Sequence, residues 1–192
     1  LPEIIIKKFS KTFLLDKQYI KKLYLPRAKT AHKGNFGHSL IIAGSEGFSG
    51  AAVISANSAV KTGSGLITLM TPKNIQSIVS SQLLEAMTAS FEDKESSLKL
   101  LKNADSVAFG PGLGNNFSTL ELLEYVINNT NIPIILDADG INSLSNNLGL
   151  MKNLKNRCIL TPHPGEFSRL SGYSIEEINH NRIKLAKEFA EK

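Results

Sequence analysis

Cysteine is almost missing from this sequence, since Cys158 is the single one among 192 residues. One thiol cannot form a disulfide within the chain or a cysteine metal cluster, so a reducing compartment, the cytoplasm, is expected. Because Cys158 lies in an apolar run, it is predicted to be a buried small hydrophobe.

Long hydrophobic runs and targeting patterns are also absent. No stretch of 18 apolar residues occurs, so no membrane-spanning segment is expected, and the start at Leu1 does not have the pattern of a signal peptide. The sequence begins without Met and stops at Lys192 inside a helix-like pattern. Both ends are therefore expected to be cut points.

The sequence has only a small excess of positive charge. The chain has 22 Lys and Arg against 17 Asp and Glu, a net charge of +5. No basic stripe with interleaved aromatics is found, so a basic surface is expected rather than nucleic-acid binding. An anionic substrate is compatible with this charge. The hydrophobic fraction of 42% is enough for the core of one domain.

Short apolar runs alternate with helical patterns of about ten residues after an arm that has no core pattern. We expect the arm at residues 1–28, joined through Pro26 and Arg27, and one domain at residues 29–192. Strands are predicted at 39–43, 65–70, 86–89, 106–109, 132–136 and 157–160. Helices are predicted at 50–61, 72–80, 94–102 and 118–127, once or twice within 140–154, and from 175 to the end, with Ser118 and Ser174 as N-caps in capping boxes. This alternation predicts an α/β fold with a mostly parallel sheet and helices on both faces.

Glycine-rich turns follow two of the predicted strands. Residues 44–51 read Gly-Ser-Glu-Gly-Phe-Ser-Gly-Ala, and residues 110–114 read Gly-Pro-Gly-Leu-Gly. The first spacing matches neither the dinucleotide nor the Walker pattern, so an ordinary strand–helix turn and a ligand loop both stay open. Three glycines in five residues favour a ligand-facing loop with an anion-binding nest of N–H groups over a plain turn.

Acidic side chains end another predicted strand. Asp137 and Asp139 could hold Mg²⁺ through water or accept hydrogen bonds from ligand hydroxyls. Asp139 could equally cap the helix that starts near Gly140. No residue is assigned as a direct metal ligand.

The segment Thr161-Pro-His-Pro-Gly-Glu166 is the most informative of the chain. His163 lies between two prolines, so its backbone is stiff and its ring is expected at a ligand. Glu166 could bind a metal-bound water or cap the next helix. Strand ends of this kind form the ligand crevice in open α/β sheets.

Together these motifs, with His32-Lys-Gly-Asn-Phe-Gly37, resemble the ADP/ATP-dependent NAD(P)H-hydrate dehydratases of the ribokinase-like superfamily. The resemblance runs from about Lys29 to Lys192 and implies a three-layer ribokinase-like fold, incomplete at its C-terminus. It implies dehydration of the S epimer of hydrated NADH or NADPH: ADP or ATP, with Mg²⁺, phosphorylates the 6-hydroxyl, and phosphate then leaves. Positions that match hydrate-binding positions of the family are Ala51, Gly110, Gly112, Gly114 and His163. Asp137, Asp139, Asn142 and Glu166 match polar positions that line its cleft.

The resemblance also implies partners and a missing part. An epimerase domain before Leu1 and a homo-oligomer are expected. Two motifs of the family, Leu-Lys-Gly and Gly-Thr/Ser-Gly-Asp, do not occur in the 192 residues. The second carries the anion hole and the catalytic aspartate, which is expected beyond Lys192, so this chain alone is expected to be inactive. The alternatives are a nucleotide-binding regulatory lobe, or a sugar or vitamin kinase of the same superfamily, against which residues 161–166 argue.

Overall fold

The computed structural model describes residues 12–24 and 26–192. The chain divides into two compact units, Leu1–Ala31 and His32–Lys192. In the described part of the first unit, helix α2 (Lys17–Leu23) is capped by the Asp16 carboxylate, which accepts from the Tyr19 N–H at 2.8 Å, and none of its residues is buried. Residues 1–11 and 25 of the predicted arm lie outside the described residues. The predicted boundary after residue 28 stays a prediction.

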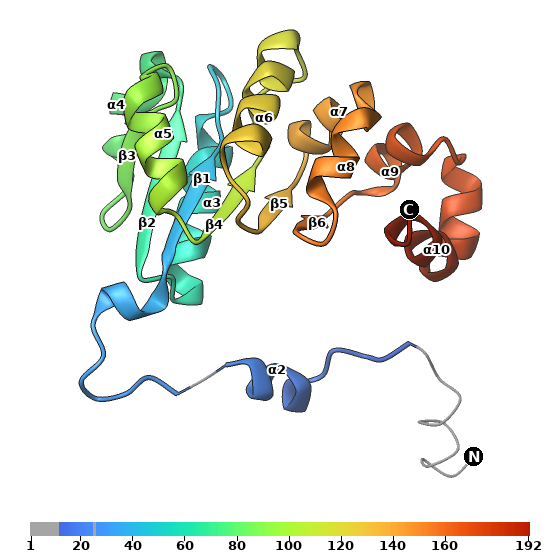
Figure 1. Cartoon of the computed structure of the whole chain (residues 1–192), viewed down its shortest axis with the longest axis horizontal. Helices are drawn as coiled ribbons and strands as arrows, with labels where there is room; N and C mark the ends of the chain where they lie inside the picture. Colours follow the sequence, from blue (N-terminus) through green and yellow to red (C-terminus); the bar gives the residue numbers. More distant parts are fainter. Residues whose placement is uncertain (1–11, 25) are drawn as a thin grey trace. The chain divides into compact units, whose positions relative to one another are not determined.

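The second unit is built on a six-stranded sheet in which every pair is parallel (Figure 1). Its strands are β1 (His38–Ile42), β2 (Leu66–Thr71), β3 (Met87–Ser90), β4 (Ser106–Phe109), β5 (Ile134–Leu136) and β6 (Cys158–Leu160). Their order in the sheet is β3-β2-β1-β4-β5-β6. The chain therefore moves outward from β1 to β3, returns to place β4 on the other side of β1, and then moves outward to β6. The predicted parallel α/β fold is confirmed.

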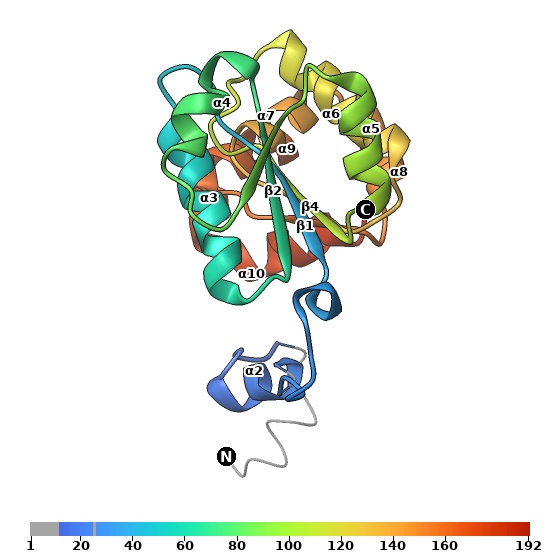
Figure 2. The same cartoon turned by 90° about the vertical axis from the view of Figure 1, so that its left-hand side faces the viewer.

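Helices cover both faces of the sheet, because alternate strand residues point to opposite sides. Helices α3 (Ser49–Thr62) and α4 (Lys73–Ser80) lie on one face, and α5 (Lys94–Asn103) and α6 (Phe117–Asn129) lie on the other (Figure 2). Ile41 belongs to the core under α3 and α4, whereas its neighbours Leu40 and Ile42 belong to the core under α5 and α6. The small buried residues Ala52 and Ala56 let α3 approach the strands closely.

Beyond β5, the C-terminal elements extend the core past the sheet (Figure 1). They are α7 (Asp139–Asn146), the 3-10 turn η2 (Leu148–Leu150), α8 (Met151–Leu154), α9 (Pro164–Ser171) and α10 (Ile175–Ala190), the last kinked at Asn181. Phe167 of α9 and Phe189 of α10 pack edge to face, with ring centroids 5.3 Å apart. On the α3 side of the sheet, Ile135 of β5 and Ile159 of β6 stay 40% and 61% exposed.

Two details of the sequence prediction change. Ser118 is not the cap of α6: Asn116 is, with its side-chain oxygen accepting from the Thr119 N–H at 3.0 Å, so the helix already begins at Phe117. The strand expected from 132 begins at Ile134, because Pro133 has no N–H to donate to a neighbouring strand. The Ser174–Glu177 capping box of α10 is confirmed. No helix in the described ranges is long and apolar enough to span a bilayer.

Candidate functional site at the carboxyl ends of the strands

The strand order places a topological switch point between β1 and β4. The chain leaves β1 toward β2 on one side and leaves β4 toward β5 on the other. Loops that follow these two strands therefore diverge in direction and leave room for a ligand at the carboxyl ends of the strands. The two loops that meet here are residues 43–48 and 110–116. They contain the predicted turn at 110–114 and the first five residues of the predicted turn at 44–51, whose last three residues begin α3.

The structure brings the two glycine loops into direct contact. The Gly44 N–H donates to the Pro111 carbonyl at 2.8 Å, and the Ser45 hydroxyl donates to the Gly112 carbonyl at 2.7 Å. Gly112 lies against the start of α3, where a Cβ atom on it would be 2.9 Å from the Cβ of Ala51. Ala51 and Gly112 are far apart in sequence and form one surface at the switch point.

The three glycines of the 110–114 loop have a backbone explanation that the sequence did not reveal. Gly110, Gly112 and Gly114 all have positive φ angles, of 128°, 66° and 85°, so each is favoured by conformation alone. The predicted nest is also smaller than expected. The N–H groups of Gly110, Leu113 and Gly114 donate within the chain, and among the described residues Gly112 keeps an N–H without an acceptor.

The Asp137-Ala138-Asp139 turn after β5 is tied to both neighbouring loops. Asp137 accepts from the Thr161 hydroxyl at 2.9 Å, and Asp139 accepts from the Gly114 N–H at 2.8 Å. Ala138 has φ 48° and ψ −116°, a strained conformation for a residue with a Cβ. Asp139 is the first residue of α7 and does not cap it, so the capping alternative is wrong. Asn142, one turn along α7, donates weakly to Asp139 at 3.4 Å.

His163 and Glu166 form the N-terminal cap of α9. The Nδ1 atom of His163 accepts from the N–H groups of Gly165 and Glu166 at 3.0 and 3.4 Å, while Glu166 accepts from the His163 N–H at 2.9 Å. An accepting Nδ1 requires the proton on Nε2, which lies 3.2 Å from the other Glu166 oxygen. Both ring nitrogens are thus engaged, although the His163 side chain is 62% exposed. Of the two roles open to Glu166, the structure shows the cap, and this carboxylate is buried.

The predicted residues therefore form two groups. The first is linked by direct contacts or hydrogen bonds and comprises Ala51, the three loop glycines, Asp137, Asp139 and Asn142. His163 and Glu166 form the second. Thr161 joins the groups through its hydrogen bond to Asp137. Arg169 of α9 joins them through Asn142, whose side-chain oxygen accepts from the Arg169 Nε at 2.9 Å. Sequence reasoning missed Arg169, although it lies one helical turn after Gly165 and so on the face of the motif.

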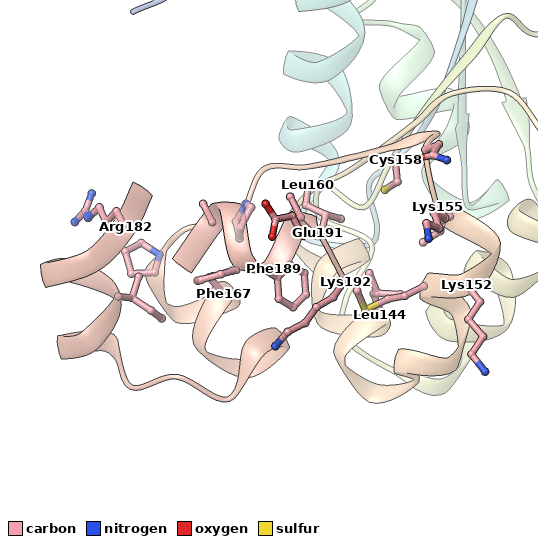
Figure 3. Close-up of a pocket in the computed structure, with 18 residues that line it drawn as sticks. Leu144, Lys152, Lys155, Cys158, Leu160, Phe167, Arg182, Phe189, Glu191 and Lys192 are labelled. Atoms are coloured by element: carbon pink, nitrogen blue, oxygen red, sulfur yellow. The ribbon is translucent and has the colours of Figure 1, made fainter. Parts of the chain in front are cut away.

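A cavity of ≈ 640 Å³ lies between β6, α8, α9 and α10 (Figure 3), and Pro162 and Pro164, on either side of His163, are among the residues that line it. None of the nine predicted site residues lines it. Cys158 does, and it is partly rather than fully buried. This partial burial raises the pKa of the Cys158 thiol to about 11. No group of three or more metal-ligating side chains occurs among residues 12–24 and 26–192.

A wholly parallel sheet of this order, with two joined glycine loops at its switch point, defines an α/β protein whose candidate ligand site is at the carboxyl ends of its strands. The Carb_kinase family model, described as NAD(P)H-hydrate dehydratase, matches residues 39–192. The chain belongs to this family.

Relatives and solved structures agree with this assignment. The chain is 37% identical over 184 residues to the bifunctional NAD(P)H-hydrate repair enzyme Nnr of Coxiella burnetii, covering 96% of this chain and 37% of the relative. It is 35% identical over 171 residues to the ADP-dependent (S)-NAD(P)H-hydrate dehydratase of Staphylococcus aureus, covering 87% and 61%. The chain thus spans between a third and two thirds of the length of the curated relatives it matches.

Two solved structures share the fold. The ADP/ATP-dependent NAD(P)H-hydrate dehydratase of Bacillus subtilis, co-crystallised with ATP and Mg²⁺, gives a TM-score of 0.73 at 27% identity, covering 92% of this chain and 62% of that one. A ribokinase-like superfamily protein of Enterococcus faecalis gives 0.72 at 26% identity, covering 84% and 58%. The expected ribokinase-like architecture is confirmed.

Proposed function

We propose that this chain supplies the hydrate-binding part of an enzyme that uses ADP or ATP to dehydrate the S epimer of hydrated NADH or NADPH and so restores the cofactor. The observation that carries the proposal is the junction of the two glycine loops at the switch point, in a chain that belongs to the dehydratase family. The loops present backbone and small side chains, which let a dinucleotide approach closely.

In this proposal the hydrate contacts Ala51, the loop glycines and His163. Because both His163 nitrogens are engaged by the α9 cap, the imidazole contributes its exposed ring to ligand packing and does not move a proton. Glu166 holds the orientation of this ring from a buried position, through its oxygen 3.2 Å from Nε2. Asp137, Asp139 and Asn142 supply oxygen and amide groups for ligand hydroxyls, and Asp137 keeps one carboxylate oxygen for which the described residues provide no donor.

ADP or ATP and Mg²⁺ belong to the proposal through the relatives that are named for the nucleotide or were crystallised with it. The described residues do not fit a resident metal cage, since no three metal-ligating groups converge and Asp137 and Asp139 already accept hydrogen bonds. Mg²⁺ is commonly held by few carboxylates together with the phosphates of the nucleotide. No step is assigned to the metal.

The proposal includes a larger assembly. Residues 29–192 are proposed as the dehydratase part, preceded by an arm and by an epimerase domain in the same polypeptide, in line with the bifunctional relatives. A homo-oligomer is part of the same expectation. The anion hole and catalytic aspartate are proposed to come from a Gly-Thr/Ser-Gly-Asp segment, which the 192 residues do not contain.

The test measures binding and turnover separately. The purified 192-residue chain is titrated with NADPH and with the S hydrate by calorimetry, and NADPH formation from the hydrate is followed by absorbance with ADP or ATP. Saturable binding without turnover is expected, with turnover appearing when a segment with the Gly-Thr/Ser-Gly-Asp motif is joined to the chain. Absence of dinucleotide binding would overturn the proposal, and turnover by the 192 residues would place the catalytic group among them.

A further inference from the structure

We propose that Arg169 binds a phosphate group of the nucleotide ligand and is therefore a ligand-binding residue of this site. The inference rests on the proposed function, and it adds a residue and a ligand group that neither the motifs nor the relatives assign. The inference follows from the position of the guanidinium beside His163, from its hydrogen bond to Asn142 and from the lack of an ion pair to it among the described residues.

The guanidinium of Arg169 lies beside the predicted site. Long side chains on a helix point back toward its N-terminus, so Arg169 reaches over the first turn of α9. A Cβ atom added to Gly165 would lie 3.7 Å from the Nη1 atom of Arg169 and 2.9 Å from Cε1 of His163. The guanidinium is thus a neighbour of the His163 ring.

One side of this guanidinium is fixed by α7. Its Nε donates to the Asn142 side-chain oxygen at 2.9 Å, and Asn142 is in turn linked to Asp139. No hydrogen-bond acceptor is found for Nη1 or Nη2 in the part of the chain that the structure describes. The terminal N–H groups are therefore available, while the hydrogen bond to Asn142 favours one orientation of the side chain, which lowers the cost of binding.

The positive charge of Arg169 has no acidic partner among the described residues. The carboxylates of the site have other hydrogen-bond partners: Asp137 accepts from Thr161, Asp139 from Gly114, and Glu166 from His163. An arginine that is hydrogen-bonded on one side and forms no ion pair at a candidate ligand site is suited to an anion. Its planar N–H groups match the oxygens of a phosphate, which every nucleotide of the proposed reaction carries.

The competing explanation is that Arg169 only ties α9 to α7 through Asn142. The two explanations differ in what a substitution changes. A structural tie predicts a lower thermal midpoint with proportionate effects on every ligand. A phosphate contact predicts a loss of nucleotide affinity in a chain that stays folded.

The experiment measures affinities of the wild-type chain, Arg169→Gln and Arg169→Lys for NADH, NADPH and ATP by calorimetry, with thermal midpoints alongside. Arg182→Gln is the matched control, because Arg182 is an exposed arginine that also donates to one asparagine, Asn179, and it lines the cavity by α10 instead. We expect Arg169→Gln to lose about tenfold or more in affinity, the size of a charge-assisted hydrogen bond. Arg169→Lys should recover part of it and Arg182→Gln should match the wild type.

Comparison of the three ligands identifies which phosphate group Arg169 contacts. Equal losses for NADH and NADPH assign Arg169 to the pyrophosphate, a loss for NADPH alone assigns it to the 2′-phosphate, and a loss for ATP alone assigns it to the phosphoryl donor. Wild-type affinity of Arg169→Gln for all three ligands, or equal losses in Arg182→Gln, would overturn the inference while the proposed function stands. No binding by the wild type overturns both.

Discussion

Gly112 lies so close to Ala51 that a Cβ atom on Gly112 would be 2.9 Å from the Ala51 methyl carbon and 3.1 Å from the Phe48 carbonyl oxygen. Residues 61 positions apart in the sequence thus share one surface, and a larger side chain at either position would displace a loop. Gly112 also has a φ of 66°. Both its conformation and its surroundings require glycine.

Replacement of Gly112 by alanine should therefore destabilise the fold more than conformation alone explains. Gly47 is the matched control, since it has a φ of 81° and nothing within 4 Å of its Cβ position. We expect Gly47→Ala to lower the free energy of unfolding by about 1 kcal/mol. Gly112→Ala should lower it by about 2–4 kcal/mol because overpacking is added. Denaturant unfolding measures both, and equal losses would show that the loop contact is not tight.

The cap of α9 predicts that His163 has a stabilising role that can be separated from its role at a ligand. His163→Ala removes the acceptor for two N–H groups and should cost about 1 kcal/mol. His163→Asn keeps a capping oxygen and should keep most of the stability, while hydrate affinity falls if the ring packs on the ligand. Thermal midpoints and calorimetric titration give the two readouts. Unchanged stability of His163→Ala would contradict the cap.

Stability should depend on pH through Glu177 in a way that Ser174 controls. Hydrogen bonds from the Ser174 hydroxyl and backbone N–H lower the pKa of Glu177 from its ordinary value. Because the folded state favours the ionised carboxylate, this contribution is present above the ordinary carboxyl pKa and is lost as the pH falls through the lowered one. In an NMR titration, Ser174→Ala should raise the pKa of Glu177. An unchanged pKa would contradict the proposed cause.

A polar substitution should lower stability much more at one of two neighbouring isoleucines of β5 than at the other. Ile134 is fully buried in the core under α6, whereas Ile135 is 40% exposed on the other face. Ile134→Thr should cost about 2–5 kcal/mol, because it leaves a cavity and buries a hydroxyl. Ile135→Thr should change stability by less than about 1 kcal/mol and should reduce self-association of this apolar face. Denaturant unfolding and light scattering distinguish the two. Similar losses for both would mean that this face is covered.

Hydrophobic periodicity, together with turn and capping residues, predicted most of the fold. The strand at residues 106–109 and the helix at 94–102 were predicted to within one residue, because their apolar spacing and flanking polar residues are local signals. The cap of α6 was missed because Ser118 and Asn116 are both good capping residues, and only the backbone geometry selects between them.

The candidate site was predicted less completely than the fold. Its motifs were visible because glycine, proline and acidic residues gather at strand ends. In one loop, however, the number of glycines led to a wrong expectation. The three glycines of the 110–114 loop suggested a free anion nest, whereas their N–H groups are mostly used within the chain. Arg169 carried only the weak signal of its i+4 spacing from Gly165, because an arginine on a helix face is ordinary until its neighbours are known.

The sequence by itself determined the α/β class, the parallel sheet and the family resemblance, because these follow from hydrophobic period and from residues close together in the chain. Only the tertiary structure decided which residues meet. It joined Ser45 to Gly112, Gly114 to Asp139 and Asn142 to Arg169, contacts over 67, 25 and 27 positions. Such contacts depend on strand order and on hydrogen-bond geometry, and nothing in the local sequence around either partner specifies them.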